Sequence, residues 1–222
     1  ETVLGYQAPL YGRRTAQYLL EPLQFKDARL FYPSFPLEDQ VRAYAVYGGT
    51  PAYLHTLQPQ QSLKENILDG ILSRGSFLYD EVRFVLQQEL REPRNYFAIL
   101  QAVAAGKTRL NEIKQATGIE GATAYLDTLQ QLHLVERIVP VTETQPQKSR
   151  RGIYRLKDHY LRFWFRYVHP NRSQLERGGA QIILENQVIP EIDHFSSLTF
   201  EEVCQQFFWQ SGLSGKLPFV PT

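Results

Sequence analysis

Residues 95–141 read NYFAILQAVAAGKTRLNEIKQATGIEGATAYLDTLQQLHLVERIVPV, and they hold three helical patterns followed by one strand pattern. Gly106 and Gly118 stand where the first and second helices would end, which is a common position for glycine. The third pattern places apolar residues on one face, and the last one alternates apolar with other residues. The stretch therefore predicts three helices and a strand over 95–106, 109–118, 121–133 and 134–141.

A polar loop at 142–152 and a short returning strand at 153–157 complete this pattern. Helix, helix, turn, helix, strand, loop and strand is the plan of a winged helix-turn-helix, which we place at 91–157. In such a domain the third helix can enter the major groove of DNA, and the loop, or wing, can contact the phosphate backbone.

The wing is predicted to be basic. Residues 142–157 carry five positive side chains against Glu143, a net charge of +4 in a chain whose formal net charge is +1: Lys148, Arg150, Arg151, Arg155 and Lys157. This charge favours contact with double-stranded DNA. Thr123 and Gln130 on the third helix are able to read bases, whereas Asp127 would repel phosphate. The alternative is a solvated loop on a domain that packs against a partner.

The residues before the winged helix predict several short helices, after a strand candidate at 16–23. The sequence SLKE at 62–65 is typical of a capping box, in which Ser62 and Glu65 each bond the other's backbone amide. A helical unit over 1–90 is therefore expected, with helices at 27–32, 38–47, 51–57, 62–74 and 77–90.

Residues 158–222 are rich in aromatic side chains and predict amphipathic helices separated at Pro170 and Pro190. Glu201 is a weak candidate for a metal-binding carboxylate. The simpler interpretation places Glu201 and Glu202 on the solvated first turn of a helix. Cys204 is expected in the core. The fold class predicted for the whole chain is mainly α, of α+β type, with this third segment incomplete.

Composition narrows the possible classes of function. The 222 residues include 24 Lys and Arg, 23 Asp and Glu, and a single cysteine, which rules out an internal disulfide and weakly favours a reducing, cytoplasmic location. No apolar run is long enough to span a membrane. The five histidines show no metal-ligand spacing and are expected to be structural or exposed. No P-loop is present, and the lack of any methionine indicates a fragment or a processed chain.

Two short motifs are compatible with nucleotide chemistry. PLYGRRT at 9–15 puts Arg13 and Arg14 on a glycine-containing turn, from which an arginine can reach a phosphate; surface salt bridges are the simpler explanation. YGGTPAYL at 47–54 combines Gly49, which allows a close backbone approach, with Pro51, which favours the start of a helix. An ordinary break between two helices fits this second motif equally well.

The order of these motifs resembles the C-terminal part of a prokaryotic family of AAA+-type ATPases, in which a helical lid, a winged helix and a restriction-endonuclease-like domain follow the nucleotide-binding core. The likeness covers nearly the whole chain, and the two short motifs lie about 35 residues apart. It implies that Arg13 or Arg14 lies near the γ-phosphate of ATP, that Gly49 and Pro51 lie near the adenine, and that Glu201 corresponds to a carboxylate of the nuclease-like domain.

The sequence also departs from this family. The resemblance implies ATP and Mg²⁺ as cofactors, but the P-loop and Walker-B acid would precede Glu1, and the remaining nuclease residues would follow Thr222. We therefore expect no autonomous catalysis from these residues. Their expected partners are a nucleotide-binding core, double-stranded DNA and, in an oligomer, further copies of the protein. Two rival hypotheses are a winged-helix transcriptional regulator without nucleotide chemistry and a protein-interaction module.

Overall fold

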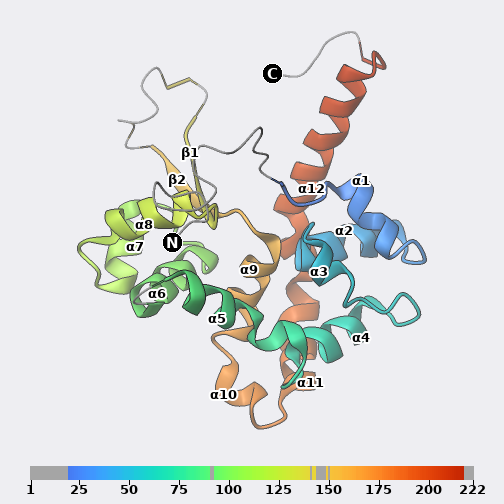
Figure 1. Ribbon diagram of the computed structural model, residues 1–222, viewed down its shortest axis with the longest axis horizontal. Coiled ribbons are helices and arrows are strands. Elements are labelled where there is room, and N and C mark those ends of the chain that lie inside the picture. The colour runs from blue at the N-terminus through green and yellow to red at the C-terminus, as the bar shows by residue number, and fades with distance from the viewer. Residues whose placement is uncertain (1–19, 91–92, 141, 144–148, 150, 218–222) are drawn as a thin grey trace, which may run out of the picture.

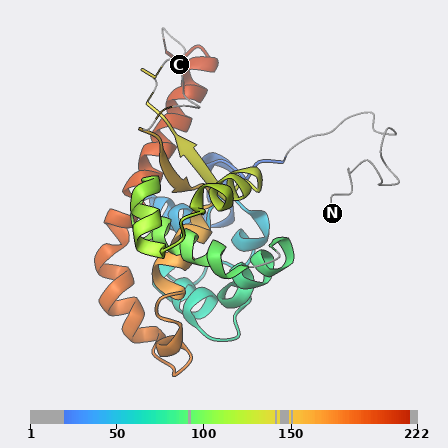
Figure 2. The ribbon, with the colours of Figure 1, turned by 90° about the vertical axis from the view of Figure 1, so that its left-hand side faces the viewer.

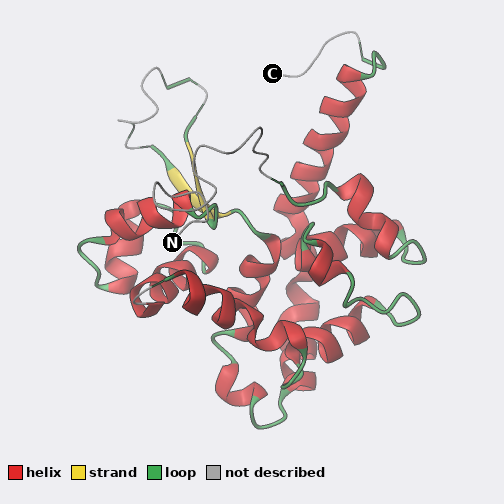
Figure 3. Cartoon of the chain, viewed as in Figure 1, coloured by secondary structure: helices red, strands yellow, loops and turns green. Residues whose placement is uncertain are grey.

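The computed structural model describes residues 20–217 except 91–92, 141, 144–148 and 150. The described chain is mainly helical, as predicted, and its strands form a two-stranded sheet (Figure 3). Within these residues, no helix is both long enough and apolar enough to cross a membrane.

The first helices confirm most of the predicted pattern before residue 90. Ser62 Oγ accepts from the Glu65 amide at 3.3 Å, and Glu65 Oε2 accepts from the Ser62 amide at 2.7 Å, so the predicted capping box is present. No strand forms at residues 20–23, and the rest of that strand candidate lies outside the described residues. The elements are α1 (Phe25–Ala28), the 3₁₀ turn η1 (Arg29–Phe31), α2 (Leu37–Tyr47), α3 (Pro51–Leu54), α4 (Leu63–Ile67), the π-helical turn η2 (Leu68–Leu72) and α5 (Phe77–Glu89).

The middle of the chain follows the predicted order of elements. Gly106 and Gly118 have φ of 89° and 67°, the left-handed conformation that glycine adopts readily after a helix. The two strands pair antiparallel, with Val135 opposite Leu156 and Ile138 opposite Ile153. The elements are α6 (Pro93–Ala104), α7 (Leu110–Thr117), α8 (Ala122–Gln131), β1 (Val135–Ile138) and β2 (Ile153–Leu156).

The last segment differs from the prediction at Pro190, Glu201, Glu202 and Cys204; Glu202 lies in the middle of α12 and is half-buried. Pro190 does not separate two helices: it is the second residue of α12, in the first turn where a helix tolerates proline, and a π-helical turn leads directly into α12. Glu201 lies in the middle of α12, not in a first turn, and Cys204 is only half-buried. The elements are α9 (His159–Phe163), the π turn η4 (Trp164–Val168), α10 (Arg172–Leu175), α11 (Ala180–Ile183), the π turn η5 (Leu184–Val188) and α12 (Ile189–Leu213).

One aromatic core joins the beginning, middle and end of the described chain. Trp164 is fully buried, and its Nε1 donates to the Tyr79 carbonyl at 2.9 Å. Phe97 of α6 packs against Trp164 and Phe165. Helix α12 runs along α2, which also packs on α9 (Figures 1 and 2). Residues 158–217 therefore share their packing with the helices of the first 90 residues.

Candidate functional site

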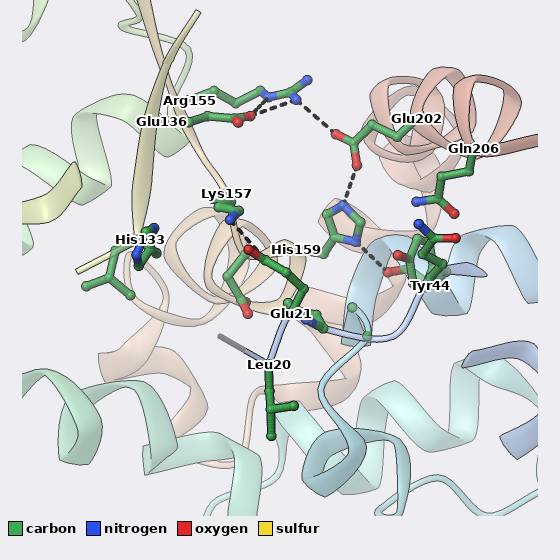
Figure 4. A pocket seen from close by; sticks show the side chains of 16 residues that line it. Leu20, Glu21, Tyr44, His133, Glu136, Arg155, Lys157, His159, Glu202 and Gln206 are labelled. Atoms are coloured by element: carbon green, nitrogen blue, oxygen red, sulfur yellow. Dashed lines mark hydrogen bonds and ion pairs between the residues drawn. The ribbon is translucent and has the colours of Figure 1, made fainter. Parts of the chain in front are cut away.

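A cavity of about 380 Å³ lies where the start of the described chain, the turn after α2, the strand pair and α12 meet (Figure 4). Its walls mix apolar surface with carboxylates and cationic side chains. The lining residues are Leu20, Glu21, Pro22, Gln24, Tyr44, Gly48, Gly49, His133, Leu134, Glu136, Arg155, Lys157, Asp158, His159, Glu202 and Gln206.

Gly48 and Gly49 form one wall of the cavity, and each favours glycine for a different reason. Gly48 has φ of 69° and ends α2 in a conformation that glycine favours. A Cβ atom on Gly49 would lie 2.0 Å from the Leu23 carbonyl oxygen. The Leu23 amide donates to the Gly49 carbonyl at 2.8 Å, and the Tyr44 hydroxyl donates to the Leu23 carbonyl at 3.0 Å. The close approach predicted for this turn is therefore made by the chain's own backbone.

His159 stands at the centre of the site, at the first position of α9. Asp158 precedes it as the N-cap and accepts from the Leu161 amide at 2.8 Å. Burial raises the pKa of Asp158, and its hydrogen bond from Leu161 and the neighbouring His159 oppose that rise. Since β2 ends only three residues before α9 begins, the cap fixes His159 close to the strand pair.

A chain of polar contacts runs from α2 through His159 to the strand pair (Figure 4). His159 Nδ1 lies 3.1 Å from the Tyr44 carbonyl oxygen, and Nε2 lies 2.7 Å from Glu202 Oε2. The other carboxylate oxygen of Glu202 lies 3.2 Å from Arg155 Nη2. Each ring nitrogen of His159 therefore faces an oxygen acceptor, the Tyr44 carbonyl on one side and the Glu202 carboxylate on the other.

The surroundings of Glu202 act on its pKa in both directions. Burial raises the pKa of Glu202. The hydrogen bond and charge of His159, together with the guanidinium groups of Arg155 and Arg162, lower this pKa by more than burial raises it, so the net shift is downward. Arg162 is itself buried and donates to Thr199 Oγ1, one turn before Glu202 on α12, at 2.5 Å. The half-buried carboxylate is therefore held in its charged form.

Two more ion pairs lie on the side of the cavity that the strand pair forms. Arg155 Nη2 lies 2.8 Å from Glu136 Oε1, its neighbour across the two strands, and Lys157 Nζ lies 3.1 Å from Glu21 Oε2. Arg155 and Lys157 are thus neutralised by carboxylates inside the site. This corrects the predicted basic wing, because two of its five positive residues are turned towards the cavity.

The predicted nucleotide residues are only partly described. Gly49 lines the cavity, whereas Pro51 is exposed at the first position of α3. Arg13 and Arg14 lie outside the described residues. The structure therefore brings one of the four into the site.

The predicted DNA-contacting residues lie elsewhere. Thr123 is exposed on α8, and half-buried Gln130 donates to the Leu126 carbonyl at 3.3 Å and to Asp127 Oδ1 at 3.4 Å. Arg151 is 73% exposed and lies 3.7 Å from Glu143 Oε1. Lys148 and Arg150 lie outside the described residues. Among the described cations of residues 142–157, Arg151 and Lys157 are exposed, and each lies within 4 Å of a carboxylate.

The metal candidate is also separate from the cavity. Glu201 is exposed, while its neighbour Glu202 lines the site. Among the described residues, no group of three or more His, Cys, Asp or Glu side chains could hold a metal ion. The expectation that the histidines are structural or exposed missed the polar network of His159. Its contact with Glu202 spans 43 positions, and local sequence spacing carries no signal for it.

The chain is similar in sequence to one protein family and to one archaeal protein. Residues 164–222 match DUF234, a family described as archaeal and bacterial proteins of unknown function. The chain is 36% identical over 222 residues to "Uncharacterized protein MJECL04" of Methanocaldococcus jannaschii, an alignment that covers 99% of the chain and 49% of the relative. No solved structure matches the chain. The chain thus spans about half the length of this relative, and its C-terminal part is similar to DUF234.

Proposed function

We propose that this chain is the lid and winged-helix portion of a longer, ATP-binding switch protein of AAA+ type, which contacts DNA through the wing. Three findings support the proposal. The two short motifs occur in the order of that family, α6 to β2 follow the order of a winged helix, and the archaeal relative is about twice as long as this chain.

One observation carries the proposal: the segment at residues 21–23 contacts both the glycine turn and the strand pair. Leu23 bonds to Gly49, and Glu21 pairs with Lys157, which follows β2. This segment comes a few residues after Arg13 and Arg14. In this proposal, a nucleotide-dependent movement of those arginines displaces residues 21–23. That displacement changes the contacts of Leu23 with Gly49 and of Glu21 with Lys157 at the same time.

The cavity itself does not fit the phosphates of a nucleotide. Four carboxylates line it: Glu21, Glu136, Asp158 and Glu202. Its two cations already have partners, because Arg155 pairs with Glu136 and Glu202, and Lys157 pairs with Glu21. A triphosphate would meet repulsion there. We therefore propose that the nucleotide binds outside the cavity, on the core that the resemblance implies. The residues of the cavity would transmit movement between the Gly49 turn and the wing.

Nucleotide binding by the complete gene product tests the first half of the proposal. Equilibrium titration with ATP and Mg²⁺ is expected to show binding that is lost in R13A or R14A. Arg74→Ala is the control, because Arg74 is exposed in a loop between η2 and α5. Unaltered ATP binding in both R13A and R14A would remove the proposed role of these arginines. A complete product that binds no ATP would favour the regulator without nucleotide chemistry.

Duplex binding by residues 1–222 tests the second half. The double variant R150A/R151A is expected to bind a DNA duplex more weakly and to show a shallower salt dependence, by roughly 0.9 in slope for each phosphate contact removed. The control K64A/R74A removes two exposed charges from the helical segment. Equal affinities for the two double variants would favour the interaction module.

A further inference from the structure

A second cavity, separate from the one in Figure 4, lies between α5, α6 and α10 (Figure 1). Its volume is about 360 Å³. Three arginines from these three helices line it: Arg83 of α5, Arg94 of α6 and Arg172 of α10. His169 and Phe97 add aromatic rings to its wall, and none of the described carboxylate side chains lines it. We call this cavity the arginine pocket.

Two of these arginines carry charges that no described carboxylate neutralises. Within the described chain, the side chains of Arg83 and Arg94 make no ion pair and no hydrogen bond. Arg83 is half-buried, and Arg94 is exposed at the second position of α6. Because a guanidinium group is always protonated in proteins, the two together can balance one doubly charged anion.

The third arginine is held in place by carboxylates that lie outside the pocket. Arg172 Nη2 lies 2.9 Å from Asp80 Oδ1, and its Nε lies 3.1 Å from Glu176 Oε1. The guanidinium also lies 5.1 Å from the centre of the Tyr79 ring. In the described structure, Arg172 Nη1 and the Tyr79 hydroxyl are buried without a hydrogen-bond partner. Buried polar groups are usually paired, so this cluster has more donors than acceptors.

His169 is fixed in the wall by aromatic packing. Its ring stacks on Trp164, with centres 5.3 Å apart and planes at 26°, and it packs against Phe97 with centres 5.7 Å apart. Burial and the charges of Arg172 and Arg83 lower the pKa of His169, so both arginines act on this ring. An anion that binds between the arginines would therefore also change the surroundings of His169, which makes the ring a reporter of binding.

The start of α6 adds to the positive potential of the pocket. Pro93 and Arg94 are the first two residues of this helix, and both line the wall. The first amides of a helix have no acceptor within the helix, and the helix dipole is positive at that end. Phosphate groups bind at helix N-termini for this reason. Here the helix end reinforces the charge of the unpaired arginines.

We infer that the arginine pocket binds a phosphate dianion, either free or as the terminal group of a small phosphate monoester. Guanidinium groups suit phosphate because they donate two parallel hydrogen bonds to its oxygens. A monoester carries about two negative charges at neutral pH, which matches the two unpaired arginines. Each phosphodiester of DNA carries a single charge, so a duplex backbone matches the pocket less well. The inference goes beyond the proposed function, because it needs neither the nucleotide-binding core nor the wing.

NMR titration of residues 1–222 with inorganic phosphate, at constant ionic strength, tests the inference. The ring signals of His169, identified by their absence in H169Q, should shift saturably with phosphate and not with chloride. The double variant R83A/R94A should weaken binding about tenfold or more. The control R29A/R109A removes two exposed arginines that do not line the pocket, and it should leave the affinity nearly unchanged.

A single variant and a second probe sharpen the test. Arg94→Ala changes an exposed side chain, so it should fold normally and weaken phosphate binding several-fold. Phenyl phosphate distinguishes the two forms of the ligand. Tighter binding than that of inorganic phosphate would assign the pocket to a monoester, and equal or weaker binding would assign it to free phosphate.

Three results would overturn the inference. The first is a His169 signal that shows no saturable response to either probe. The second is equal weakening in R83A/R94A and R29A/R109A, which would indicate a general effect of net charge. The third is a DNA duplex that displaces phosphate from the pocket at a lower concentration of phosphate groups, which would assign the pocket to a nucleic-acid backbone. These variants leave the arginines of the proposed function intact, so the two proposals can fail separately.

Discussion

His159 Nε2 lies 2.7 Å from Glu202 Oε2, and this contact joins the start of α9 to the middle of α12. Because Nδ1 of the same ring faces the Tyr44 carbonyl of α2, a single imidazole links three helices. Arg155 extends the link to β2 through the other oxygen of Glu202. The four predictions below test the contacts around the cavity.

Glu202→Gln should destabilise the protein. Hydrogen bonds to charged groups contribute about 1.5–3 kcal/mol, and the amide would lose the charge that faces His159 and Arg155. Glu201→Gln is the matched control, since the adjacent carboxylate is exposed; its effect should stay within about 0.5 kcal/mol. Urea unfolding at neutral pH measures both. Equal losses for the two variants would contradict the assigned role of Glu202.

The stabilisation from Glu202 should depend on pH in the acid range. Because the folded pKa of Glu202 is lowered, its contribution is present above the unfolded value of about 4.3 and is lost as pH falls through the lower, folded pKa. The difference in unfolding free energy between the parent and E202Q should therefore shrink as pH falls below about 4.3. A difference that grows on acidification would reverse the assigned direction of the shift.

Gly49→Ala should be destabilising, because its Cβ would collide with the backbone of Leu23. Overpacking of this kind costs about 1–3 kcal/mol. The Leu23 amide, which bonds to Gly49, should also exchange faster with solvent deuterium. Gly121→Ala is the control, since nothing lies within 4 Å of a Cβ there and its φ is −80°. Slow exchange at Leu23 in the Gly49 variant would show that the segment does not depend on this contact.

Arg155 and Glu202 should be energetically coupled. A double-mutant cycle with R155A and E202Q should give a coupling energy of about 0.5–3 kcal/mol, the range for residues in one network. The more exposed pair of Lys157 and Glu21 should give less than about 1 kcal/mol in a cycle with K157A and E21Q. Denaturant unfolding of all the variants provides the four energies of each cycle. Additive effects at Arg155 and Glu202 would show that the network acts as separate contacts.

Local patterns in the sequence were sufficient to predict the mainly helical class, the capping box at Ser62 and Glu65, and the order of three helices and two strands after residue 93. Each of these depends on residues within a few positions of one another. Helix periodicity, helix caps and the glycines that end helices act over one or two turns, so their effect can be read directly from the sequence.

Only the tertiary structure revealed the contact of Gly49 with Leu23, the polar chain through His159, and the arginine pocket. His159 and Glu202 are 43 positions apart, and nothing in this spacing predicts that the two side chains will be in contact. Periodicity shows that a helix has an apolar face, but not which other face will cover it. The covering face depends on how all the helices pack together, because burial of apolar surface is favourable wherever that surface lies in the sequence.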